Sequence, residues 1–181
     1  MKSKNNINFS YPDQTDTRIF LEWWEDLVNS SADRAWLRRS RSPGELAMCP
    51  AYHSLLARYR QAELNVNKWN GPKLAVMAGL AAHVKGRVED TPLAKQMALP
   101  PKKGDNPRVS ELRFRRILSK TTLDDLYLPM YRVLRMLDGV CDLWDLARSI
   151  YWWEKNTLNQ QGKQDTRTRW AVEYYSHLKT K

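Results

Sequence analysis

The amino-acid sequence predicts an all-α protein of about eight or nine helices, packed as two small helical bundles. Apolar residues recur at helical spacing in almost every ordered segment, and no segment shows the sustained alternation of a β-strand. The chain has 181 residues, of which 42% are hydrophobic, and it contains eight Trp and eight Tyr. This composition excludes a disordered chain, and the length is sufficient to bury a core.

Start and stop signals place the helices of the first half. A first helix is predicted from the apolar stripe Ile19, Phe20, Trp23, Trp24, Leu27 and Val28. Ser42, Pro43 and Glu45 form a start signal, with Ser42 as N-cap, Pro43 at the first helical position and Glu45 closing a capping box. The helix that it opens contains Leu46, Cys49, Tyr52, Leu55 and Leu56.

Two further breaks follow. Asn70-Gly71-Pro72 precedes a helix with Leu74, Met77, Ala78, Leu80 and Ala81, and Thr91-Pro92 starts a short helix. The basic stretch LPPKKGDNPRV at 99–109 is the expected boundary between the bundles. We therefore expect an N-terminal bundle over 1–104, with 1–17 as a candidate disordered segment, and a C-terminal bundle over 105–181.

The second half shows three N-cap signals, at Ser110, Thr122 and Asp142. The last helix is expected from about Asp165 to Leu178. Pro129 lies inside the helix that follows Thr122, where proline kinks a helix or belongs to its first turns.

The net charge of +10 is concentrated in the middle of the chain. Between Trp36 and Arg116 there are 16 Lys or Arg and 6 Asp or Glu, whereas the remaining segments are neutral. A uniformly solubilising surface does not need this distribution, but a face that binds a polyanion does.

The stretch SELRFRRILS at 110–119 places arginines beside core residues. On a helix, Phe114 and Ile117 face inward, while Arg113, Arg116 and Lys120 form a stripe along the flank and Arg115 points elsewhere. For a single arginine, a solvated surface position is the simpler interpretation. The set favours phosphate contacts, because further basic residues share the net-positive region: Arg38, Arg39, Arg41, Arg58, Arg60, Lys85 and Arg87.

Catalytic interpretations have weaker support. The sequence contains no phosphate-binding loop, no dinucleotide fingerprint and no nucleophile motif, and its three histidines are far apart. Asp138, Asp142 and Asp145 could hold Mg²⁺ for a nuclease, but their positions at helix starts favour capping. The pairs Trp23-Trp24 and Trp152-Trp153 could stack on bases, although core packing or a subunit contact is the simpler role.

Targeting and redox signals are absent. No apolar run approaches the length of a membrane span and the N-terminus has no signal core, so we expect a cytoplasmic protein. The two cysteines, Cys49 and Cys141, do not form a disulfide framework or a zinc motif.

Six motifs occur in a fixed order along the chain: LRRSRSPGEL at 37–46, CPAYHSLL at 49–56, KLAVMAGLAAHVKG at 73–86, SELRFRRILS at 110–119, VCDLWDLARSIYWW at 140–153 and RTRWAVEYY at 167–175. This ordered set resembles the CasB family, the small subunit of type I-E CRISPR Cascade complexes. The resemblance implies a non-enzymatic, all-helical protein that sits as a pair beside the backbone subunits holding the guide RNA. It also implies that basic surfaces contact target DNA and help to hold the displaced strand of the R-loop.

The resemblance orders the candidate nucleic-acid-binding residues. Arg38, Arg39, Arg113 and Arg148 match basic positions of the family, and Arg132 matches a further one. Arg41, Lys85, Arg87, Arg115 and Arg116 complete the set. The implied partners are other Cascade subunits, including the backbone and large subunits, a second copy of the chain, guide RNA and target DNA, with no membrane and no cofactor. A stand-alone helical nucleic-acid-binding protein and an aspartate-based nuclease remain the alternatives.

Overall fold

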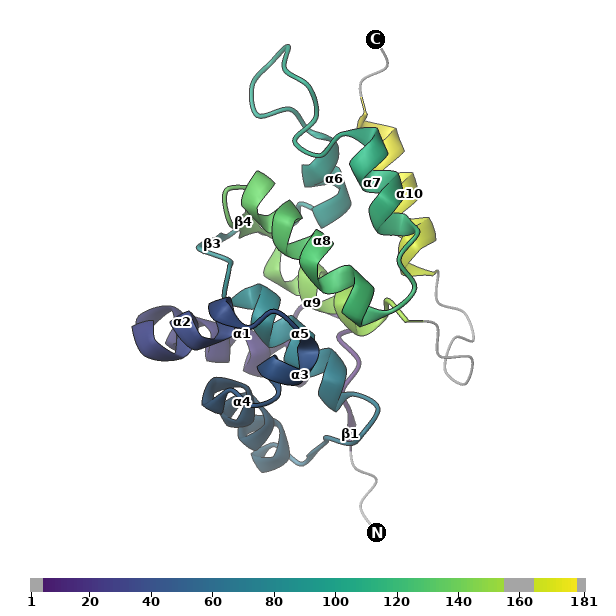
Figure 1. Ribbon diagram of the computed structural model, residues 1–181. Helices are drawn as coiled ribbons and strands as arrows, with labels where there is room; N and C mark the ends of the chain where they lie inside the picture. The colour runs from purple at the N-terminus through teal and green to yellow at the C-terminus, as the bar shows by residue number, and fades with distance from the viewer. Residues whose placement is uncertain (1–4, 155–164, 179–181) are drawn as a thin grey trace.

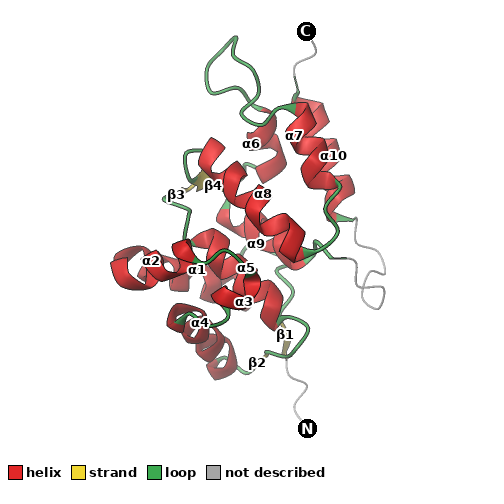
Figure 2. Cartoon of the chain, viewed as in Figure 1, coloured by secondary structure: helices red, strands yellow, loops and turns green. Residues whose placement is uncertain are grey.

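The computed structural model describes residues 5–154 and 165–178 and confirms the all-α class (Figures 1 and 2). Its described residues form ten helices: α1 Thr15–Asn29, α2 Ser31–Arg39, α3 Pro43–Leu46, α4 Pro50–Gln61, α5 Gly71–Ala81, α6 Leu93–Ala98, α7 Glu111–Leu118, α8 Leu123–Met136, α9 Leu143–Tyr151 and α10 Thr166–His177. Four two-residue strands form two parallel pairs, β1 Asn5–Asn6 with β2 Leu64–Asn65 and β3 Gly86–Arg87 with β4 Val140–Cys141.

The helix count exceeds the expected eight or nine for two reasons: no helix was predicted where α2 lies, and the helix predicted after Ser42 is divided in two. Ser42 caps α3 as expected, accepting a hydrogen bond from the Glu45 amide, whereas the Glu45 carboxylate accepts from the backbone of Arg41 rather than that of Ser42. Cys49 is extended, with φ −76° and ψ 130°, and Pro50 begins α4. A residue before proline avoids the helical region, so the break is set by Pro50.

Helix α5 lies at the centre of the fold. Nine of its eleven residues are buried, and it packs against α3, α8 and α9 (Figure 1). A helix that is apolar around its whole circumference has to be covered on all sides, which explains its position. Gly79 allows a close approach here, because a Cβ at this position would lie 2.5 Å from Leu46 Cδ2 of α3 and 3.0 Å from the Tyr127 hydroxyl of α8.

A buried polar network joins α6, α9 and α10. The Asp145 carboxylate accepts hydrogen bonds from the Leu93 amide at 2.8 Å and from the Arg169 guanidinium at 2.6 Å. Arg169 also bonds to Glu173 and to the Ser149 hydroxyl. Helix α7 is attached to this unit by its Phe114 ring, which stacks on Tyr174 with centroids 3.8 Å apart.

The structure differs from the expectation of disorder over 1–17 for the residues that it describes there. Ile7 and Phe9 are buried, and Asp16 accepts hydrogen bonds from the amides of Asn8 and Phe9. The Tyr151 hydroxyl donates to the Ile7 carbonyl at 2.6 Å, so this segment contacts the carboxyl end of α9.

The division into bundles at residue 104 stays a prediction. One continuous cluster of buried side chains extends over both halves of the chain. Helix α6, which precedes the predicted boundary, packs against α10 (Figure 1).

Substituting Asp145→Asn is expected to lower the free energy of unfolding by about 3 kcal/mol, at the lower end of the range for breaking a buried ion pair, because Glu173 still faces Arg169. Urea denaturation at neutral pH measures this change. The matched control is Glu22→Gln, which removes an exposed pair with Arg18 on α1 and should cost less than about 0.5 kcal/mol. Equal losses in the two variants would contradict a stabilising role of the buried network.

Candidate nucleic-acid interface

Helices α7 and α8 enclose a groove with a volume of about 350 Å³. Its rim carries Arg113, Arg116 and Lys120 from the α7 side and Arg132 from α8. Its floor is apolar and consists of Val109, Ile117, Pro129, Val133 and Met136. None of the described residues that line it is acidic. We call this feature the α7–α8 groove.

Helical spacing explains why the cations of α7 meet at one edge. Phe114 and Ile117 are buried and attach the helix to the core, while Arg113 and Arg116 are exposed one turn apart. Lys120 follows one turn later, beyond the end of the helix. The predicted stripe of Arg113, Arg116 and Lys120 is thus present, and the fold adds Arg132.

A second basic cluster surrounds His83 and Tyr131 on the other side of α8. The two rings are 4.5 Å apart, and the Arg135 guanidinium lies 5.9 Å from the centre of the Tyr131 ring. The pKa of His83 is lowered to about 4, first by burial and then by the charges of Arg38, Arg34 and Arg41. Three arginines therefore act on one imidazole, and we call this set with Arg135 the His83 cluster.

Two of these arginines are held by the carboxyl end of α5. Arg34 donates to the carbonyls of Ala82 at 3.0 Å and Val84 at 2.6 Å, and Arg38 donates to the carbonyl of Ala82 at 3.0 Å. Carbonyl groups at the end of a helix lack helical partners and attract cations. Arg34 and Arg38 are therefore fixed in position before any ligand binds.

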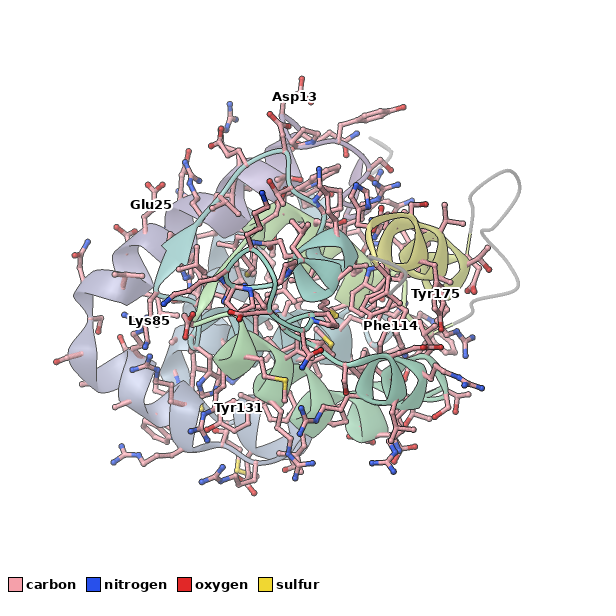
Figure 3. The ribbon with its side chains drawn as sticks, turned by 90° about the horizontal axis from the view of Figure 1, so that it is seen from above. Asp13, Glu25, Lys85, Phe114, Tyr131 and Tyr175 are labelled. Atoms are coloured by element: carbon pink, nitrogen blue, oxygen red, sulfur yellow. The ribbon has the colours of Figure 1, made fainter. Side chains whose placement is uncertain are left out.

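Helix α8 forms the shared wall of the two basic features. Tyr131 and Arg135 are one turn apart and face the His83 cluster, whereas Arg132 and Met136 are one turn apart and line the groove. In Figure 3, Tyr131 lies at the outer side of α8, and Phe114 lies inward between α7 and α10. We call the two features together, carried by α2, α7 and α8, the basic face.

The remaining predicted residues lie outside these two features. Arg39 is exposed at the end of α2. Arg115 lies on the other flank of α7, where it opposes the rise in the pKa of Tyr175 caused by burial and Glu111. Lys85 is exposed beside Gly139, and Arg87 pairs with Glu25 at 3.6 Å and Glu89 at 3.7 Å.

Arg148 belongs to the surroundings of the buried network. It is half-buried, and its guanidinium lies 5.3 Å from the Trp144 ring centre. Its pKa is lowered, first by burial and then by the charge of Arg169. The fold therefore brings together five predicted residues, Arg38 and Arg41 at His83 and Arg113, Arg116 and Arg132 at the groove.

Arg34 and Arg135 belong to the basic face but were not predicted from the sequence. Arg34 precedes Arg38 by four residues and Arg135 follows Tyr131 by four, so helical spacing was the available signal. Assigning either side chain to this face requires knowing where α5 and α2 lie.

The aspartates proposed for a nuclease have structural partners. Asp142 caps α9 by accepting from the Asp145 amide at 3.0 Å, and Asp138 pairs with Arg108 at 3.1 Å. Burial is the main cause that raises the pKa of Asp142. Within residues 5–154 and 165–178, no three His, Cys, Asp or Glu side chains are grouped to hold a metal ion.

Most of the tandem tryptophans serve the core. Trp23, Trp24 and Trp153 are buried, and their indole N–H groups donate to the carbonyls of Ala51, Ala81 and Lys120, respectively. Trp152 is half-buried and donates to the carbonyl of Asn8. Among the described helices, none is long and apolar enough to cross a membrane.

The fold and the site define the class of this protein: it is an all-helical protein with a preformed basic face. The sequence model of the family described as CRISPR-associated protein Cse2 matches residues 33–175. The chain belongs to this family, which confirms the resemblance to CasB drawn from the sequence.

Solved structures share the fold. A chain in the crystal structure of E. coli Cascade bound to a PAM-containing dsDNA target superposes with a TM-score of 0.65 at 18% identity, covering 87% of this chain and 94% of that chain. CasB from Thermus thermophilus gives a TM-score of 0.64 at 20% identity, covering 90% and 99%, respectively. Among curated protein sequences, none matches the chain.

The His83 imidazole is expected to titrate with a pKa of about 4, which an NMR titration measures. Arg38→Met should raise this pKa, although not to the ordinary value of about 6.5, because burial is the largest cause. Since the folded pKa lies below the unfolded one, His83 contributes stability above pH 6.5 that is lost as the pH falls toward 4. Arg39→Met is the control and should leave the titration unchanged; a shift as large as that of Arg38→Met would contradict the assignment.

Proposed function

We propose that this protein is the non-catalytic small subunit of a Cascade-type, RNA-guided surveillance complex in antiviral defence. Its basic face contacts the backbone of the target or displaced DNA strand and stabilises the R-loop. The observation that carries the proposal is the position of α8, which contributes residues both to the α7–α8 groove and to the His83 cluster. Family membership and the similarity to a chain of E. coli Cascade support it.

The charges of this face are available to a ligand. Arg113, Arg116 and Arg132 are exposed and form no ion pair with a described residue. Phosphate contacts position a strand without reading its bases, which suits a complex whose guide RNA supplies the sequence specificity. R-loop formation is a nearly balanced exchange of duplexes, so a few such contacts are enough to shift it.

The proposed partners are those that the family resemblance implies. The protein acts in the cytoplasm beside the backbone and large subunits of the complex, together with a second copy of itself, the guide RNA and the target DNA. It uses no cofactor and binds no membrane.

Replacing Arg116 by Gln is expected to flatten the salt dependence of single-stranded DNA binding by the assembled complex. Each lost phosphate contact should reduce the slope of log affinity against log salt by about 0.7. Arg115→Gln is the matched control, because it removes the same charge from the other flank of the same helix, and it should leave the slope unchanged.

The outcomes separate the proposal from its alternatives. Equal effects of the two substitutions, in complexes that assemble normally, would show that net charge rather than the basic face holds the strand. Binding by the free chain as tight as that by the complex would favour a stand-alone nucleic-acid-binding protein. Mg²⁺-dependent cleavage that is lost in Asp142→Ala would identify a nuclease.

A further inference from the structure

We infer that the α7–α8 groove is a base pocket, which accepts an unpaired nucleobase while the cations on its rim hold the flanking phosphates. The proposed function requires only phosphate contacts, and a flat basic surface would provide them. The groove instead combines a basic rim with a hollow, apolar floor. The inference deepens the proposed function and rests on it.

The size and floor of the groove match one nucleotide. Its volume of about 350 Å³ lies at the lower end of the roughly 300–1,000 Å³ of small-ligand sites. Ile117, Val133 and Met136 provide an apolar surface against which the face of a base can be buried. An apolar floor does not stabilise a bound phosphate. It does stabilise an unstacked base, because the face of the base is then removed from water.

The charged rim suits a nucleotide and not an apolar peptide. Arg113, Arg116 and Arg132 present donors only, as does Lys120, and no described lining residue carries a carboxylate. These donors are complemented by acceptors, namely the phosphate oxygens and the ring nitrogens and carbonyl oxygens of a base. A guanidinium plane also stacks on a base. Because these donors sit on long side chains, the pocket is expected to accept different bases.

The pocket makes the site selective for single strands. In a duplex the bases are paired and stacked, so removing one costs a few kcal/mol, whereas an unpaired strand offers its bases freely. The His83 cluster lies across α8 from the pocket, so the phosphates on one side of the inserted base have a second cationic partner. The displaced or incoming strand of an R-loop has this single-stranded character.

The test compares two strands of equal charge binding to the full-length protein at low salt, by fluorescence anisotropy. One is oligothymidine, and the other is an abasic oligodeoxyribose phosphate of the same length. The wild type is expected to bind oligothymidine about tenfold more tightly, as for one base held on a protein surface. Ser119 also lines the groove. Ser119→Leu adds volume there without changing charge and should reduce this ratio to near one.

Ser176→Leu is the matched control. Ser176 on α10 is exposed and donates to a backbone carbonyl, that of Val172, just as Ser119 donates to that of Arg116. It does not line the groove, so the tenfold ratio should persist. Circular dichroism establishes that both variants are folded.

Three results would overturn the base pocket: equal binding of the two strands by wild type, no binding of either strand, or an unchanged ratio in Ser119→Leu. These results leave the proposed function intact when Arg116→Gln still flattens the salt slope of the assembled complex. If Arg116→Gln has no effect there and the tenfold ratio persists, the pocket stands and the proposed function fails.

Discussion

The buried carboxyl end of α5 is the constraint on which the basic face depends. Ala81 at the end of α5 and the residues Ala82 and Val84 that follow it are buried, so their carbonyl groups need protein donors. Trp24 supplies one to Ala81, and the guanidinium groups of Arg34 and Arg38 supply the others to Ala82 and Val84. The need to pair these carbonyl groups therefore fixes two arginines in position. The same pairing creates the His83 cluster, one of the two parts of the proposed binding site.

Helix α8 lies between this fixed cluster and the α7–α8 groove and contributes residues to both. The Tyr127 hydroxyl approaches Gly79 of α5 and donates to the carbonyl of Ser40, which ties α8 to the end of α2. Residues one turn apart on α8 then face either the His83 cluster or the α7–α8 groove. Helices position most of these cations, whereas Arg41 and Lys120 lie just beyond the ends of α2 and α7. Holding side chains on helices limits the entropy that is lost when a strand binds.

The fold could be predicted from local signals more completely than the site. Ser42, Thr122 and Asp142 cap their helices as predicted, because a cap depends on residues three positions apart. Ser110 stands at the predicted N-cap position of α7, but its side chain forms no capping hydrogen bond. The stripe on α7 was predicted for the same reason. Arg132 joins that stripe, and the Ile7 carbonyl meets Tyr151, only through packing between distant segments. For Arg148, the prediction of a strand contact came from the family resemblance and not from a local signal. The structure places this residue beside the buried network.

The acidic residues explain why the face stays cationic. Asp145 and Glu173 are committed to Arg169 in the interior, Asp142 caps α9 and Asp138 pairs with Arg108. Arg87 is partly neutralised by Glu25 and Glu89, away from the groove. On α7, Phe114 and Ile117 are buried in the core. Arg113 and Arg116 have no acidic partner among the described residues, and they border an apolar floor. Arginines beside core residues are thus the local arrangement that places positive charge around an apolar hollow, and a strand with exposed bases complements both.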